Sequence, residues 1–286
     1  MVSFPLDSFG LNSSAPTFSQ LDAEYDSSVN AAWVFMRGTP RPCFTPDLLS
    51  ELNAYQAHIT RGITREPSRY QYMISASRVE GVFNLGGDLE LFASLIKQGS
   101  RDALYTYARS CIDILYKNMR HYYSDLTTIS LVQGDALGGG FEAALSSNVL
   151  IAERGCKLGL PEVVFNLFPG MGAYSFLSRK TNPKTAEEII LRGKLYCAEE
   201  LYEMGVIDIL AEPGQGYNEV YNYIAQQKKS PNTRKILRKV KDICNPITYE
   251  ELINITAVWS DEALQLTPKD LRMVDRLIKA QNNKHS

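Results

Sequence analysis

A glutamate that follows a run of glycines is the most informative feature of this sequence. The run is Gly138–Gly140, and Glu142 stands two residues beyond it, three residues after Gly139. Where a strand turns into a helix, such glycines expose unpaired backbone N–H groups, and the helix dipole adds partial positive charge. A ligand oxygen can approach closely because no Cβ stands in the way. A carboxylate beside a carbonyl polarised in this way could move protons at the adjacent carbon.

Two glycine-rich segments of the chain call for an explanation. They are Phe83–Leu89 (FNLGGDL) and Val132–Glu142, which contains ALGGGFE. Each alone has a structural explanation, since glycine is the usual residue wherever a strand turns sharply into a helix. Neither segment matches the dinucleotide pattern GxGxxG, and no Walker lysine follows either. The sequence therefore predicts neither a dinucleotide site nor a P-loop.

The elements around these segments alternate between strand and helix up to about residue 212, which predicts an α/β core. We expect strands at 32–36, 70–75, 127–132 and 149–152, and helices from 46, over 88–98, over 101–122 and over 141–147. Beyond that point apolar residues recur with helical period through 216–227, 233–244, 247–259 and 268–281. The predicted organisation is an extended arm over 1–28, a core domain over 29–212 and a helical region over 213–286.

Composition narrows the class of protein. With 30 Lys and Arg against 32 Asp and Glu, the net charge of −2 argues against a nucleic-acid binder. Five scattered cysteines without CxxC spacing and three histidines outside any motif predict neither a disulfide framework nor a metal site. The sequence shows no apolar run of membrane-spanning length and no secretory signal at its start. We therefore expect a cytoplasmic protein without a membrane span.

The two segments resemble the oxyanion motifs of the crotonase (enoyl-CoA hydratase/isomerase) superfamily. FNLGGDL is similar to the first motif and ALGGGFEAAL to the second, and GLPEV places Glu162 where the family carries its second catalytic glutamate. This resemblance implies a ClpP/crotonase-like α/β spiral of β-β-α units. It implies that the N–H groups of Gly87 and Gly139 hold a thioester oxygen, with Glu142 and Glu162 as the acid/base pair. It also implies a homo-oligomer, generally a trimer, and no cofactor.

The residues around Glu162 are strongly apolar. Leu160, where typical hydratases carry glutamine, belongs to this group together with Phe165 and Met171. Core packing alone would explain them; the functional interpretation is that they line a tunnel for an acyl chain. About nine buried methylenes could contribute up to ~7 kcal/mol, and an apolar wall should raise the pKa of a carboxylate. The predicted substrate-binding residues are Gly86, Leu137, Gly138, Leu160, Phe165, Met171, Tyr174 and Trp259.

Within the superfamily, the sequence resembles the bacterial diffusible signal factor synthases. The similar segments are Arg41–Phe44, Phe83–Asp88, Tyr107–Cys111, Ala136–Ala144, Asn166–Ser175 and Ile255–Trp259. This resemblance implies dehydration of a 3-hydroxyacyl group on acyl carrier protein to a cis-2-enoyl group, followed by thioester hydrolysis. The product would be a quorum-sensing fatty acid of the cis-2-dodecenoic type. It also implies a signal-sensing regulatory protein as a partner.

Several alternatives stay open at this stage. The basic run Arg234–Lys241 could bind an acidic carrier protein or CoA phosphates, or it could be an ordinary solvated helix face. The enzyme could equally be a CoA-dependent enoyl hydratase, isomerase or acyl-CoA hydrolase, because one fold supports many reactions. A third possibility is a regulatory binding module whose acyl pocket no longer catalyses. The intact glutamates and glycines argue against this last reading.

Overall fold

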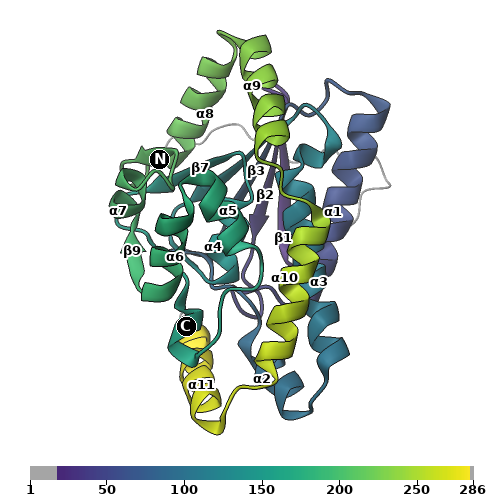
Figure 1. Cartoon of the computed structure of the whole chain (residues 1–286). Helices are drawn as coiled ribbons and strands as arrows, with labels where there is room; N and C mark the ends of the chain where they lie inside the picture. Colours follow the sequence, from purple (N-terminus) through teal and green to yellow (C-terminus); the bar gives the residue numbers. More distant parts are fainter. Residues whose placement is uncertain (1–17, 284–286) are drawn as a thin grey trace.

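The computed structural model describes residues 18–283, apart from the side chains of Arg234 and Asn283 (Figure 1). Its centre is a six-stranded sheet with the order β1-β2-β3-β5-β7-β10. These strands are β1 (Leu21–Asp26), β2 (Ala31–Met36), β3 (Tyr72–Ser77), β5 (Thr127–Val132), β7 (Val149–Glu153) and β10 (Ile209–Ala211). All neighbours are parallel except β1 and β2, which run antiparallel.

A second, smaller sheet has the order β4-β6-β8-β9. Its strands are β4 (Val82–Asn84), β6 (Asp135–Leu137), β8 (Lys157–Gly159) and β9 (Leu195–Cys197), and only β9 runs antiparallel to its neighbour. Three successive units each give one strand to the large sheet, one to the small sheet and then a helical element. Those elements are α2 (Leu89–Lys97), α4 (Gly139–Leu145) and the 3₁₀ helix η2 (Pro161–Phe165). The predicted α/β spiral of β-β-α units is therefore confirmed.

Local sequence accounts for several boundaries. Thr45 caps α1 (Pro46–Arg65) by accepting a hydrogen bond from the Leu48 N–H, and the proline suits the first turn. The strand β2 is buried along its whole length, as expected for an inner strand with an apolar run. The helix predicted over 101–122 is shorter than expected, because α3 (Arg101–Met119) ends before the 3₁₀ turn η1 (His121–Tyr123). Three successive residues of that turn have φ near +55°, which no α-helix tolerates.

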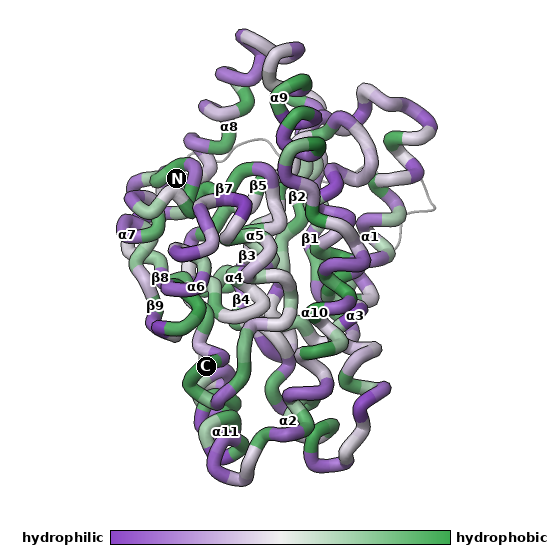
Figure 2. The backbone as a smooth tube through the Cα atoms, viewed as in Figure 1, coloured by the Kyte–Doolittle hydropathy of each residue, from purple (hydrophilic) through white to green (hydrophobic). Residues whose placement is uncertain are grey.

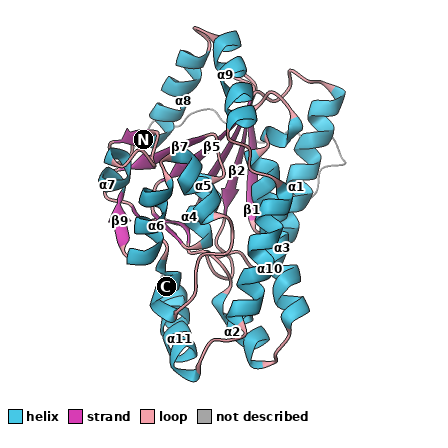
Figure 3. Ribbon diagram, viewed as in Figure 1, coloured by secondary structure: helices cyan, strands magenta, loops and turns pink. Residues whose placement is uncertain are grey.

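The remaining helices surround the two sheets (Figures 1 and 3). After β8 come α5 (Ala173–Lys180), α6 (Pro183–Arg192) and α7 (Ala198–Glu203); the C-terminal quarter holds α8 (Gly216–Gln227), α9 (Pro231–Cys244), α10 (Tyr249–Ala263) and α11 (Pro268–Asn283). The predicted helical character of this last region is confirmed. Helix α8 packs on the large sheet, α10 on α3 and α11 on α2, so these helices lie against the core.

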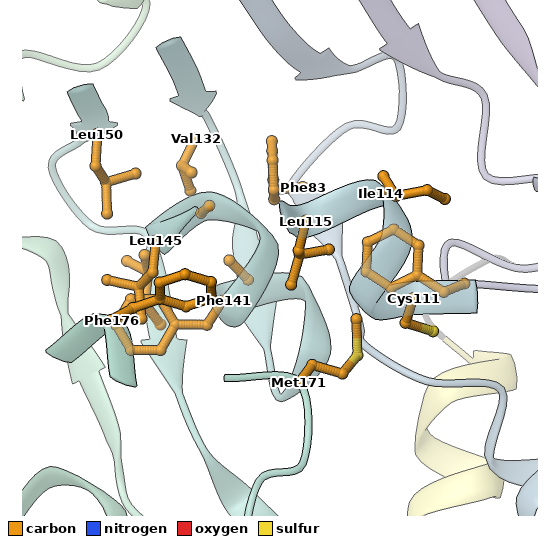
Figure 4. Packing of buried hydrophobic residues seen from close by; sticks show 14 of the residues in the cluster. Phe83, Cys111, Ile114, Leu115, Val132, Phe141, Leu145, Leu150, Met171 and Phe176 are labelled. Carbon is orange, nitrogen blue, oxygen red and sulfur yellow. The ribbon is translucent and has the colours of Figure 1, made fainter. Parts of the chain in front are cut away.

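The main hydrophobic core lies between α4 and the elements around it. Phe141, Leu145 and Phe176 gather on one side of α4, while Leu115 and Cys111 of α3 lie on the other (Figure 4). Apolar residues follow the strands through the middle of the molecule, whereas the outer helices alternate between polar and apolar residues (Figure 2). Within residues 18–283, none of the helices combines the length and the apolar composition that a membrane crossing needs.

The predicted extended arm over 1–28 needs one correction. Residues 1–17 lie outside the described part of the chain, but Leu21–Asp26 forms the edge strand β1, paired along its length with β2. Its sequence LDAEYD alternates apolar and polar residues, as expected of an edge strand with one covered face, although only Leu21 is fully buried. Asp22 of β1 forms ion pairs with Arg37 and Arg78, which follow β2 and β3, so these pairs help to keep β1 at the edge of the sheet.

Candidate active site

The site is built from three loops that follow neighbouring strands of the small sheet. Leu85–Asp88 follows β4, Gly138 follows β6, and Leu160 follows β8. These three strands are adjacent and parallel, so their carboxyl ends lie at one edge of the sheet. Ligands of parallel sheets bind at such edges. The topology therefore brings together residues that are 75 positions apart in the sequence, such as Gly87 and Glu162.

The first loop places Gly87 at this edge. The Phe44 N–H donates to the Gly86 carbonyl over 2.7 Å, and the Asn84 side chain accepts from the Gly86 N–H over 2.8 Å. Gly86 has a φ of +91°, and a Cβ there would lie 3.0 Å from the Gly139 nitrogen. Glycine is needed at position 86 because the two glycine loops touch at this point.

The second loop places Gly139 at the first position of α4. Gly138, directly before the helix, has a φ of +52°, which favours glycine. The first N–H groups of a helix have no partner within it. Among the hydrogen bonds of residues 18–283, none is donated by the N–H of Gly139 or of Gly87. Two free amide donors therefore lie on neighbouring loops, as an oxyanion hole requires.

A cavity of about 70 Å³ joins these donors to both glutamates. It is lined by Gly87, Asp88, Leu89, Phe92, Tyr107, Ala108, Cys111, Gly139, Glu142, Glu162, Phe165, Leu167, Gly170, Met171 and Trp259. Room of this size holds about five water molecules. The four positions predicted to carry the chemistry, 87, 139, 142 and 162, thus share one cavity.

Glu142 is held firmly in its place. Its Oε1 accepts hydrogen bonds from the backbone N–H groups of Met171, over 2.8 Å, and Ala173, over 2.9 Å. The side chain is buried, with 1% of the residue exposed. Burial and the nearby Glu162 raise the pKa of Glu142 well above its usual value, while the two amide donors act in the opposite direction.

Glu162 has a different environment. Its Oε2 is buried and has no hydrogen-bond partner among the described residues. Its Oε1 lies against Gly138, where a Cβ would come within 2.7 Å of it. Burial raises the pKa of Glu162 to about 7. Two carboxyls that face one cavity do not both ionise readily, so the protonation of one is coupled to that of the other.

The other predicted substrate residues divide into two groups. Phe165, Met171 and Trp259 line the cavity. Gly86 and Gly138 shape it through their backbone only, because their missing Cβ atoms make room for Gly139 and Glu162. Leu137, the last residue of β6, does not line the cavity.

Besides Leu137, two predicted positions lie outside this lining. Leu160 is 0% exposed and packs in the main hydrophobic core. Tyr174 is 42% exposed, because it lies on the outer face of the first turn of α5. Neither side chain lines the cavity. Apolar or aromatic character alone did not reveal which side of the local backbone each side chain would take.

Several lining residues were not predicted. Phe92 of α2 lies between Phe165 and Trp259, with ring centroids 6.2 and 5.4 Å away. Tyr107 and Cys111 reach the cavity from α3, one helical turn apart. The resemblance noted for 107–111 assigned them no role, and their helical spacing is one that ordinary core residues share, so the pattern did not separate them from the core.

The basic run on α9 is largely engaged within the chain. Lys235 pairs with Asp125, and Arg238 donates to the carbonyls of Asp125 and Leu126 over 2.7 and 2.8 Å. Lys239 lies 3.9 Å from the same Asp125. These contacts fasten α9 to the segment before β5. They leave fewer cations for a partner than the sequence suggested.

Comparison with known proteins settles the family. The model of the family described as enoyl-CoA hydratase/isomerase matches residues 53–258. The chain belongs to this family. The matched residues include both glycine loops, both glutamates and every other lining residue of the cavity except Trp259, which lies one residue beyond the match.

Relatives and solved structures agree with this assignment. The chain is 30% identical over 173 residues to an Arabidopsis thaliana protein named "Probable enoyl-CoA hydratase 2, mitochondrial", which covers 58% of this chain and 53% of the relative. The structure of this chain aligns over 92% of its length with that of enoyl-CoA hydratase from Bacillus halodurans, which is covered to 100%, at 22% identity and a TM-score of 0.74. It also aligns over 93% of its length with the structure of Pseudomonas aeruginosa DspI, which is covered to 99%, at 21% identity and a TM-score of 0.67. At these identities the two structures show a shared fold.

The extent of the curated matches is limited. The chain spans about half of the Arabidopsis hydratase and about a fifth of two plant multifunctional proteins of fatty acid β-oxidation that it also matches. Family membership and fold are thus established. The particular reaction must be argued from the site.

Proposed function

We propose that this protein adds water to, or removes it from, the carbons next to the carbonyl of an acyl-CoA thioester. The observation that carries this proposal is the single cavity with two free amide donors and two buried glutamates. Water addition needs one group to take a proton from water and another to give a proton to the α-carbon. A pair of carboxyls that holds one proton between them meets both needs, in either direction.

The steps balance without any further reactant. The N–H groups of Gly87 and Gly139 bind the thioester oxygen and stabilise the negative charge that forms on it. Each such donor typically contributes about 3–4 kcal/mol to the transition state. In dehydration, the ionised carboxylate takes the α-proton, the bond from the β-carbon to its hydroxyl breaks, and the neutral carboxyl gives its proton to the departing oxygen. Hydration is the reverse of this sequence.

The aromatic end of the cavity fits the acyl group. Phe92, Phe165 and Trp259 line the cavity together and form its apolar side. An acyl chain directed there would bury apolar surface at about 25 cal/mol per Å². The same apolar side keeps the carboxyls out of water, which favours the neutral form that donates a proton.

A second candidate is a finer version of the same chemistry. It is dehydration of a 3-hydroxyacyl group on acyl carrier protein to a cis-2-enoyl group, followed by attack of water on the thioester carbonyl and release of the thiol. The apolar surroundings of Glu162 and the motif resemblance to diffusible signal factor synthases favour it. A carrier protein and a regulatory partner belong to this candidate, whereas a homotrimer follows from the superfamily resemblance and belongs to both candidates.

One pair of assays separates the two candidates. With trans-2-enoyl-CoA substrates, the first predicts loss of the ultraviolet absorbance of the conjugated thioester and formation of 3-hydroxyacyl-CoA. With 3-hydroxydodecanoyl-carrier protein, the second predicts free cis-2-dodecenoic acid, detected by mass spectrometry. A protein that is inactive on both while folded and monodisperse would contradict both proposals.

A further inference from the structure

The Gly87 loop is held by more contacts than its place at a strand end requires. Gly87 lies between two peptide groups, Gly86–Gly87 and Gly87–Asp88, and each has its own partners from distant parts of the chain. The orientation of the Gly87 N–H depends on both. If that N–H binds a thioester oxygen, as the proposed function requires, then the residues that fix these peptides set the strength of the oxyanion hole.

The first peptide is fixed through its carbonyl. The Phe44 N–H donates to the Gly86 oxygen over 2.7 Å. In a planar trans peptide the N–H points opposite to the C=O, so this bond directs the Gly87 N–H away from Phe44. A hydrogen bond to the carbonyl also polarises the peptide and strengthens its N–H as a donor.

The second peptide is held by two side chains, one at each end. The Asp88 N–H donates to the Tyr107 hydroxyl over 2.8 Å, and Gln281 Nε2 donates to the Gly87 carbonyl over 3.1 Å. The Tyr107 hydroxyl in turn donates to the Phe44 carbonyl over 2.7 Å. One phenol therefore ties the segment that orients the first peptide to the N–H of the second.

Gln281 comes from the last helix of the chain. Helix α11 packs beside α2 at the same end of the molecule (Figure 1). Gln281 is 4% exposed, and its Nε2 also lies 3.3 Å from the Leu85 carbonyl. Two carbonyl oxygens as neighbours determine which atom of the amide is nitrogen. The contact spans 194 residues of sequence, so no local need of the helix explains it.

We propose that Tyr107 and Gln281 are positioning residues, which hold the Gly87–Asp88 peptide so that the Gly87 N–H points into the cavity. The phenol suits this task because burial raises its pKa well above the usual value, which keeps the hydroxyl neutral and able to donate and accept. Neither side chain takes part in proton transfer. The inference rests on the proposed function of the cavity and adds to it the residues that align its first donor.

The test uses the full chain with Tyr107→Phe, Gln281→Met and the double variant. Matched controls are Tyr105→Phe, two residues away on α3, and Gln265→Met, an exposed glutamine after α10. The first readout is kcat and KM with trans-2-enoyl-CoA. The second is the infrared carbonyl stretch of bound dodecanoyl-CoA, ¹³C-labelled at the thioester carbon, which reports how strongly the hole polarises the bond.

We expect each positioning variant to lower kcat about 10- to 100-fold with KM changed less than about threefold, because a misplaced donor weakens the transition state more than the ground state. The carbonyl stretch should move back toward its value in water. The double variant should lose less than the product of the single losses, because both act on one peptide. The controls should match the parent protein.

Two results would overturn the inference: an unchanged carbonyl stretch and kcat in the variants, or a loss confined to KM. If one variant does not fold, the other carries the test alone, since each removes a separate contact. Failure of the proposed function gives a different result, namely a parent protein that binds the thioester without any carbonyl shift and without turnover.

Discussion

The two glutamates of the cavity are an instructive contrast. Glu142 follows the first turn of α4 and accepts two backbone hydrogen bonds from the segment 171–173, so its carboxylate is part of the framework. Glu162 sits on a short 3₁₀ helix, and its Oε2 has no hydrogen-bond partner within residues 18–283. Both are buried, and burial raises the pKa of both. The difference indicates that one carboxyl is fixed by the protein, while the other is left for the ligand to satisfy.

The largest effects are expected when either carboxyl is removed, and the two removals should differ in their effect on stability. Glu142→Ala and Glu162→Ala should each lower kcat by about 10²–10⁴-fold, since each deletes one member of the acid/base pair. Only Glu142→Ala leaves two buried N–H groups without acceptors, which should cost about 1–3 kcal/mol of unfolding free energy for each. Steady-state kinetics and denaturant unfolding measure the two effects. Equal loss of stability in both variants would show that the contrast is wrong.

The pH dependence of stability should sharpen the contrast. Glu162 has a pKa of about 7 in the folded chain against 4.5 as its ordinary value, so the folded state binds the extra proton between these values. The contribution of Glu162 to the free energy of unfolding is therefore largest below about pH 4.5 and is lost as the pH rises through about 7, a fall on the order of 3 kcal/mol. Glu162→Gln should remove this fall, measured by unfolding at several pH values.

The control for this experiment is Glu80→Gln, an exposed glutamate before β4. It should leave the pH profile of stability as it is in the parent protein. If the pH profile of Glu162→Gln also stayed the same as that of the parent protein, then burial would not raise the pKa of Glu162 as described, and the contrast between the two glutamates would be wrong.

A methyl group on Gly138 tests the position of Glu162 rather than its presence. A Cβ there would lie 2.7 Å from Oε1, and the φ of +52° adds backbone strain. We expect Gly138→Ala to lower kcat at least tenfold, because small displacements of a reacting group are costly. Gly155→Ala is the matched control, with a φ of +88° and nothing within 4 Å of the added atom. Both should lose about 1 kcal/mol of stability, but the control should keep its kcat.

The smallest effect is expected beside the Glu142 anchor. Tyr174 follows Ala173, yet its ring is exposed and lines no cavity. Tyr174→Phe should change kcat and KM less than about twofold, because a surface hydroxyl away from the site contributes little. A tenfold change in KM would restore the substrate-binding role that the sequence alone suggested.

The sequence predicted which four positions come together at the cavity, but fewer of the residues that surround them. Glycine runs followed by glutamates have a local meaning, because they mark strand-to-helix turns with free amides, and these positions meet in one cavity. The side-chain direction of Leu160 and Tyr174 depends on packing against other elements, which no local pattern records. Tyr107 and Gln281 were missed for the same reason, since their partners lie 19 and 194 residues away.

The small sheet also sets a scale for the whole reaction centre. Neighbouring strands lie about 4.8 Å apart, whatever their side chains, because the backbone hydrogen bonds fix that distance. Gly87, Gly139 and Glu162 each follow a different one of three adjacent strands. The hydrogen bonds between the strands therefore fix the spacing of the backbone segments that carry these three residues. A spacing set by the backbone does not depend on particular side chains, and the fold is shared with a structure that is only 22% identical to this chain. Substitutions elsewhere can then reshape the ligand space without altering the distances on which proton transfer depends.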